Sequence, residues 1–113
     1  PLEINGQGKQ NRDFIYIDDI VRAFLIAGFQ NQTPASRAYN VSSGRMTSLV
    51  KIVNTIRKFE PYLEVKFKSG ADDEISYCCN ASRFKRDFGW SPKTSLTKGI
   101  QQTLNYFGRG KNK

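Results

Sequence analysis

The sequence predicts an α/β fold with about four helices and three or four short strands. The run from Phe14 to Ile17 is apolar on both faces, as in a strand covered on two sides in a layered architecture. Apolar stripes at helical spacing occur three times behind capping residues, and a stretch with period-two alternation separates two of them. With 113 residues, 38% of them hydrophobic, the chain forms one small domain or part of a larger one.

The first predicted helix follows directly after the predicted buried strand. Asp18 offers an N-cap and Asp19 a first-turn acid, so the helix is expected to run to about Phe29. A loop is expected at 31–36, and a short strand at 37–44 that runs into a glycine turn. The apolar stripe of this first helix comprises Ile20, Val21, Phe24, Leu25 and Ala27.

The second helix is expected to begin at a cap and to end at a proline. Thr47 or Ser48 provides the cap. The helix stops near Glu60 because Pro61 disfavours helical backbone in the residue before it. Its apolar stripe is formed by Leu49, Ile52, Val53 and Ile56.

The last part of the chain predicts two strands and two helices. Residues 63–67 alternate apolar and charged side chains, as in a half-exposed strand, and residues 75–79 form a second strand. A short helix is expected from Asn80 or Ser82 to about Phe88. The final helix is capped by Ser95 and turns Leu96, Ile100, Leu104 and Phe107 inward.

Composition excludes several classes of function. The chain contains no histidine, which removes His-based triads and relays and the commonest metal ligand. Cys78 and Cys79 are adjacent, which suits neither a Cys-x-x-Cys site nor a useful disulfide loop, so they are expected to be reduced thiols in a strand. No apolar run is long enough to span a bilayer and the first residues do not resemble a secretion signal, so a cytoplasmic protein is expected.

The net charge of +8 suggests an anionic partner, either a nucleic acid, an acidic surface or a phosphorylated small molecule. Much of this charge lies on exposed helix positions and in the basic tail 108–113, where solvated charges are the simpler interpretation. No stretch interleaves aromatic and basic residues as RNA-binding sheets do, so nucleic-acid binding is not expected.

Two short motifs mimic those of nucleotide enzymes in the wrong structural context. Gly6 and Gly8 begin a Gly-x-Gly pattern, but its third glycine would fall on Asn11 and the loop precedes a strand instead of a helix. These glycines are expected to form a tight turn with positive φ angles. Tyr62 and Lys66 have the Tyr-x-x-x-Lys spacing of a catalytic pair, which requires one helical face, whereas this stretch predicts an extended chain.

Arg12 is the most informative cation, because it lies beside the glycine turn at the entrance to the predicted buried strand. Its planar guanidinium can bind a phosphate with two parallel hydrogen bonds. Alternatively, it forms a salt bridge with Asp13 or with another acid. Local sequence alone leaves both interpretations open.

Three blocks in order carry a resemblance to a known family: "GQGKQNRDFIYIDDIVRAFLIA", "AYNVSSGRMTSL" and "NASRFKRDFGWSPKTSLTKGIQQTLNYF". In sequence and spacing they resemble the C-terminal part of extended short-chain dehydrogenases/reductases, the family of NAD-dependent nucleotide-sugar epimerases and dehydratases. The resemblance covers about residues 2–107. It implies the substrate-binding portion of an NAD(P)-binding, Rossmann-type enzyme at 1–107, followed by a basic flexible tail at 108–113.

The resemblance also implies roles for particular residues. In the family, the arginine of the Arg-Asp-aromatic block contacts the diphosphate of the nucleotide-sugar, which implies this role for Arg12. The asparagine of the Tyr-Asn block, which lies by the phosphates in some members, corresponds to Asn40. The family's Arg-Pro-Gly-Asp turn aligns its acid with Asp73, but Gly70 stands at the arginine position, and Lys68 is the nearest cation that could replace it.

Two further positions are expected to have structural roles. Asn80 stands where the family usually has an aspartate at a helix start, and asparagine caps a helix about as well. Trp90, in the segment resembling Leu-Gly-Trp-x-Pro, is expected to be a packing anchor rather than a ligand.

By the same resemblance, the parent enzyme binds NAD and a nucleotide-sugar, pairs this portion with an N-terminal Rossmann domain, and forms a homodimer. The NAD fingerprint and the helical Tyr-x-x-x-Lys pair belong to that N-terminal domain, so no catalytic residue, bound cofactor or metal is expected in residues 1–113. The alternative is a non-catalytic module that kept the fold and binds an anion or a partner. The sequence does not distinguish the sugar, the base or the reaction.

Overall fold

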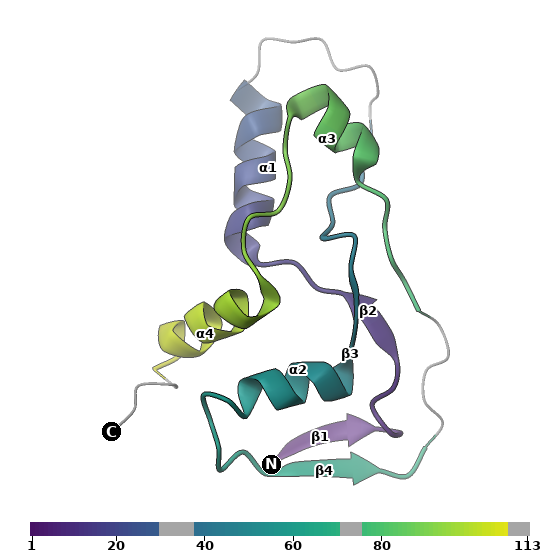
Figure 1. The fold of residues 1–113 in the computed structure, drawn as a ribbon, viewed down its shortest axis with the longest axis vertical. Coiled ribbons are helices and arrows are strands. Elements are labelled where there is room, and N and C mark those ends of the chain that lie inside the picture. Colours follow the sequence, from purple (N-terminus) through teal and green to yellow (C-terminus); the bar gives the residue numbers. More distant parts are fainter. Residues whose placement is uncertain (30–37, 71–75, 109–113) are drawn as a thin grey trace.

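The α/β fold is confirmed by a computed structural model, which describes residues 1–29, 38–70 and 76–108. Four helices and four short strands occur in these ranges (Figure 1). The predicted loop at 31–36 and Asp73 lie outside them. The elements are β1 (Leu2–Asn5), β2 (Asn11–Asp13), α1 (Ile17–Phe29), β3 (Met46–Ser48), α2 (Leu49–Ile56), β4 (Val65–Lys68), α3 (Ser82–Phe88) and α4 (Leu96–Tyr106).

The strands form two separate pairs. β1 and β4 are parallel, with Leu2 opposite Val65, and β2 and β3 are antiparallel, with Arg12 opposite Thr47. The turn between β1 and β2 contains Gly6 and Gly8 with φ angles of 70° and 72°, which confirms the predicted glycine turn.

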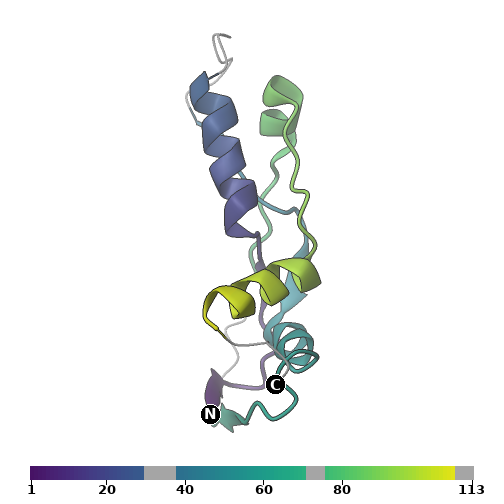
Figure 2. The same ribbon diagram turned by 90° about the vertical axis from the view of Figure 1, so that its left-hand side faces the viewer.

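The molecule is elongated and thin, with extents of 49 × 37 × 15 Å. Helices α1 and α3 lie at one end, and α2 with the β1–β4 pair lies at the other (Figures 1 and 2). Strands β2 and β3 and the connections that leave them join the two ends. No helix in residues 1–29, 38–70 and 76–108 is long and apolar enough to cross a membrane.

An aromatic cluster fills the α1–α3 end. Ala23 of α1 packs with Phe84 and Phe88 of α3 and with Trp90, which is only 1% exposed. The rings of Phe84 and Trp90 meet edge to face with centroids 5.6 Å apart. The indole N–H of Trp90 donates to the Asp19 carbonyl at 3.1 Å, so both the apolar ring and its polar atom are satisfied and the predicted packing role is confirmed.

The local helix signals were largely correct. Ser48 and Ser95 cap α2 and α4 by accepting hydrogen bonds from the amides three residues later, and α1 ends at Phe29 as predicted. The Asn80 side chain accepts a hydrogen bond from the Ser82 amide at the start of α3, and Gly89 ends that helix with φ at 63°. Three ends were wrong: α1 begins at Ile17, so Asp18 lies in its first turn and does not cap it, α2 stops at Ile56, and Phe107 lies beyond α4 and is 70% exposed.

The predicted buried strand at 14–17 is wrong. β2 ends at Asp13, Phe14 is 36% exposed, and Ile17 is 61% exposed and already begins α1. A strand needs a neighbour for its backbone groups, and β3 begins only at Met46, which lies opposite Asp13, so it does not extend alongside residues 14–17. The Tyr16 carbonyl instead accepts the amides that open the first helical turn.

The strands expected at 37–44 and 75–79 are also wrong in their described parts, 38–44 and 76–79. These two segments contact each other through side chains instead of a backbone ladder. The Ser42 hydroxyl donates to the Cys79 carbonyl at 2.9 Å, and the Asn40 amide donates to the Asn80 carbonyl at 3.4 Å. Cys78 and Cys79 are free thiols, as expected, but they are exposed on this irregular segment.

Strand pairing was the weakest part of the prediction. β1 was not predicted, and β4 begins at Val65, two residues after the expected start of its strand. Tyr62 lies on a turn and Lys66 on β4, so the two residues do not share a helical face. This agrees with the prediction that the Tyr-x-x-x-Lys match is accidental.

Candidate functional site

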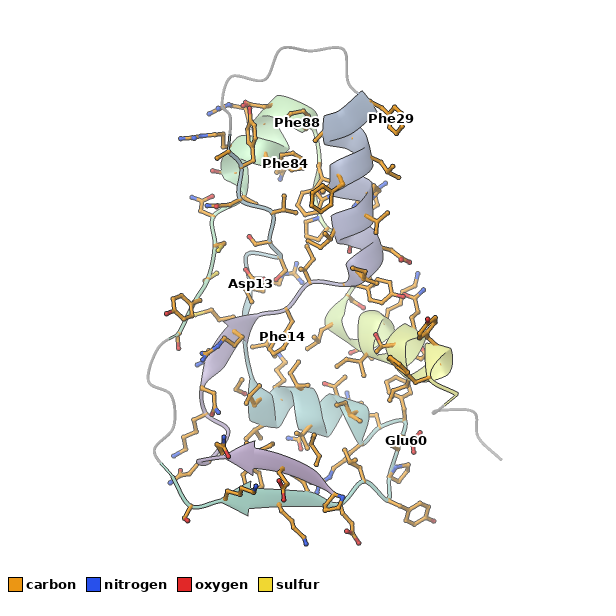
Figure 3. The ribbon with its side chains drawn as sticks, turned by 180° about the vertical axis from the view of Figure 1, so that it is seen from behind. Asp13, Phe14, Phe29, Glu60, Phe84 and Phe88 are labelled. Atoms are coloured by element: carbon orange, nitrogen blue, oxygen red, sulfur yellow. The ribbon has the colours of Figure 1, made fainter. Side chains whose placement is uncertain are left out.

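Three segments that are distant in sequence meet at the middle of the molecule. They are β2, the turn at 42–45 and the extended segment at 76–80. Figure 3 shows Asp13 and Phe14 between the end containing Phe84 and Phe88 and the end formed by α2 and the β1–β4 pair. We call this meeting point the β2 junction.

The carboxylate of Asp13 holds the β2 junction together. One oxygen accepts hydrogen bonds from the Ser43 amide, at 2.9 Å, and from the Ser43 hydroxyl. The other oxygen accepts the Gly44 amide at 2.9 Å and lies 3.9 Å from the Cys78 sulfur. Gly44 has a φ of 69°, which lets consecutive amides of this turn point at the same anion.

Arg12 lies on the same strand and is half-buried. Its backbone is fixed by pairing with Thr47 of β3, and its Nη1 donates to the Asn11 carbonyl at 2.8 Å. The guanidinium carbon lies 5.6 Å from the centroid of the Tyr77 ring. Asp13 is occupied by the 43–44 turn, so the salt bridge considered between these neighbours is not the arrangement seen.

The other predicted substrate residues that the structure describes, Asn40 and Lys68, have contacts in different parts of the molecule. Asn40 is exposed and its side chain contacts Asn80, three residues after Tyr77 on the same segment. Lys68 ends β4 and forms an ion pair of 2.6 Å with Glu3 of β1, in the other sheet. The β2 junction therefore brings Arg12 and Asn40 to one segment, whereas Lys68 belongs to the β1–β4 pair.

An open cleft of about 540 Å³ adjoins the junction, between the 42–45 turn, the 78–82 segment and residues 90–92. Ser42, Ser43 and Asn80 supply hydroxyl and amide groups, and Arg45 and Lys85 supply positive charge. Such a lining suits an anionic, hydrogen-bonding ligand better than an apolar one.

The Cys78 thiol of the cleft is not suited to nucleophilic chemistry. Loss of solvation and the neighbouring Asp13 carboxylate raise the pKa of the Cys78 thiol above its ordinary value. No cluster of His, Cys, Asp or Glu that could hold a metal ion occurs in the three described ranges. The β2 junction contains hydrogen-bonding groups and charged side chains.

The glycine turn of residues 6–8 does not fit a dinucleotide. A Cβ added to Gly8 would lie 3.0 Å from Cγ2 of Val50, so the missing side chain makes room for α2 of the chain itself. The turn also leads into β2, whereas the dinucleotide fingerprint places its glycines at the start of a helix.

The sequence selects Arg12, whose role stays a prediction, but it does not indicate the hydrogen bonds of Asp13, which it offers only as an ion-pair partner of Arg12. It also missed the contacts of Tyr77 and Cys78 with β2. Hydrogen bonds between residues about 30 positions apart leave no periodic pattern in the sequence. The one local indication of the Asp13 contacts was the glycine of the 42–45 turn.

Comparisons with known proteins agree on one family. A family model described as GDP-mannose 4,6 dehydratase matches residues 1–103. CDP-abequose synthase from Salmonella muenchen is 33% identical over 101 residues, which cover 86% of this chain and 34% of that protein. UDP-glucuronic acid decarboxylase 1 from Arabidopsis thaliana is 27% identical over 108 residues, covering 95% of this chain and 24% of the relative.

Solved structures show the same partial coverage. UDP-glucose 4-epimerase from Thermotoga maritima, determined with UDP-glucose, superposes with a TM-score of 0.80 at 29% identity, covering 95% of this chain and 34% of that one. UDP-glucuronic acid 4-epimerase from Bacillus cereus, in complex with UDP-glucuronic acid and NAD, gives a TM-score of 0.84 at 25% identity, covering 96% and 35%. The chain thus spans about a third or less of the length of these relatives.

Proposed function

The chain belongs to the family described as GDP-mannose 4,6 dehydratase, within the extended short-chain dehydrogenases/reductases, and from this premise we propose that it binds the nucleotide diphosphate of a nucleotide-sugar. Its relatives are NAD-dependent nucleotide-sugar epimerases and dehydratases, and this chain covers only a part of them. In this proposal the parent enzyme oxidises the sugar, and residues 1–107 hold the substrate in place for that step.

The observation that carries the proposal is the arrangement of the β2 junction. Arg12 comes from a strand whose backbone is paired, and Asn40 contacts the same 76–80 segment that places Tyr77 beside the guanidinium. A guanidinium can bind two phosphate oxygens at once, and the amide adds neutral donors. Holding the diphosphate contributes to rate by orienting the sugar, which is a positioning role rather than bond chemistry.

Lys68 and Asp73 remain weaker parts of the proposal. Lys68 must release or share its ion pair with Glu3 to reach a phosphate, and as an ammonium it offers a point charge only. Asp73 stays a prediction, since it lies outside the described residues.

The proposal assigns the cofactor to another part of the parent enzyme. Homologous structures contain NAD, whereas the glycine turn of this chain is filled by its own packing and does not fit a dinucleotide. NAD would supply transient oxidation of the sugar from an N-terminal Rossmann domain. The homodimer and the cytoplasmic location stay predictions.

The test is a nucleotide-sugar titration of the full-length protein by calorimetry. A screen of UDP-, CDP-, dTDP- and GDP-sugars identifies the ligand, and Arg12→Ala is then compared with Arg12→Lys. Because hydrogen bonds to charged groups contribute about 1.5–3 kcal/mol, Arg12→Ala is expected to weaken binding by about 10- to 100-fold, and Arg12→Lys by less.

The matched control is Arg57→Ala, which removes an exposed arginine at the end of α2. Its affinity should equal that of the unmodified protein. Unchanged affinity in Arg12→Ala would overturn the proposed role of the β2 junction.

A further inference from the structure

We propose that Asp13 is a positioning residue of the diphosphate site, which sets the relative placement of Arg12 and Asn40 through the turn at 43–44. This inference rests on the proposed function. Asp13 is separate from the residues that would touch the substrate, because its carboxylate is already occupied by the chain itself.

The first argument is the number of hydrogen bonds that converge on this one carboxylate. The amides of Ser43 and Gly44 each donate at 2.9 Å, to different oxygens, and the Ser43 hydroxyl donates to the first of them. A carboxylate can accept several donors at once, and each charge-assisted bond is stronger than a neutral one. The 43–44 turn is therefore fixed relative to β2.

The second argument is what the turn controls. The segment that leads into it contains Asn40 and Ser42, and both side chains bond to carbonyls of the 79–80 segment. Arg12 directly precedes Asp13 and lies beside Tyr77 of the same segment. Releasing the turn from Asp13 would allow the Asn40 segment and the Arg12 strand to move independently.

Asp13→Asn keeps the shape of the side chain but not its set of acceptors. Whichever way the amide is turned, its NH₂ group faces a backbone amide of Ser43 or Gly44, and two donors cannot bond to each other. The expected result is about tenfold weaker nucleotide-sugar binding by the full-length protein. The matched control Asp18→Asn, at an exposed acid in the first turn of α1, is expected to leave binding unchanged.

A double-mutant cycle distinguishes positioning from general loss of stability. If Asp13 acts by placing Arg12, Asp13→Asn should weaken binding much less when Arg12 is already alanine. Full additivity of the two effects would overturn the proposal, because a merely structural loss weakens both backgrounds equally. If Arg12→Ala weakens binding but Asp13→Asn does not, this inference fails and the proposed function stands.

Gly44→Ala provides a second variant in case Asp13→Asn folds poorly. A Cβ on Gly44 meets no atom within 4 Å, so the substitution strains only the positive φ that aims the two amides at the carboxylate. Gly44→Ala should weaken nucleotide-sugar binding, as Asp13→Asn does, and it should weaken binding much less when Arg12 is already alanine. If Asp13→Asn folds poorly, unchanged nucleotide-sugar binding by Gly44→Ala alone would refute the positioning role.

Discussion

Asp19→Asn should destabilise the protein by removing the charge that ties α1 to the segment before α4. Asp19 is 2% exposed, and its carboxylate accepts the backbone amides of Lys93 and Thr94, each at 2.9 Å. It also accepts a hydrogen bond from Nη2 of Arg22 at 2.8 Å, and the same nitrogen donates a hydrogen bond to the Ser91 carbonyl. An asparagine offers one acceptor oxygen, so at least one of these donors loses its partner.

The pKa of Asp19 gives the size of the effect. Burial alone would raise this pKa, but the hydrogen bonds from Lys93, Arg22 and Thr94 outweigh burial and lower it from 3.8 to about 2. That difference corresponds to about 2.5 kcal/mol in favour of folding when the group is ionised. Because the folded pKa is the lower one, this contribution is complete above about pH 5 and is lost as the pH falls through 3.8 towards 2.

The assay is urea unfolding of the full-length protein at pH 7 and at pH 3, with hydrogen exchange of the Lys93 and Thr94 amides as a local readout. Asp19→Asn should lower the free energy of unfolding by about 2 kcal/mol at pH 7, and by less at pH 3, and the two amides should exchange faster. Asp18→Asn should change stability by less than about 0.5 kcal/mol. An Asp19→Asn effect that is equally large at both pH values would refute the charge-based explanation.

Two further pairs of substitutions test the packing and capping that support the site. Gly8→Ala should lower the free energy of unfolding by about 2 kcal/mol, because it adds backbone strain at a φ of 72° and places a Cβ 3.0 Å from Cγ2 of Val50, whereas Gly89→Ala should add backbone strain alone. Urea unfolding measures both variants, and equal losses of stability would contradict the packing contribution at Gly8. Ser48→Ala should cost about 1 kcal/mol by removing the cap that accepts the Lys51 amide, while Ser48→Asp, which keeps an acceptor, should restore most of it in the same unfolding measurement.

The helices could be predicted because their signals are local. A cap, an apolar stripe and a terminal glycine all lie within one element, as for Ser48 and α2 or Gly89 and α3. The strands could not be placed in this way, since β1 is a strand only because it pairs with β4 about 60 residues later. Apolar character alone predicts a strand at 14–17, but among the described residues the pairing of β2 with β3 stops at Asp13.

The contacts around the candidate site could be predicted only in part, for the same reason, and the roles of its residues stay predictions. Arg12 could be selected because it follows a glycine turn and an apolar run comes after it, although the strand at this point is β2, which contains Arg12 itself. The role of Asp13 depends on the amides of Ser43 and Gly44, which a single sequence does not bring together. Lys68 was proposed from proximity in sequence, and the structure pairs it with Glu3 instead.

In the proposed function, a nucleotide-sugar binds at the β2 junction. Hydrogen exchange of the full-length protein, measured with and without saturating nucleotide-sugar, tests it most directly, because it reports every segment at once. We expect slower exchange in β2, in the 42–45 turn and in the 76–80 segment. A ligand that binds tightly but protects only segments outside these three would contradict it.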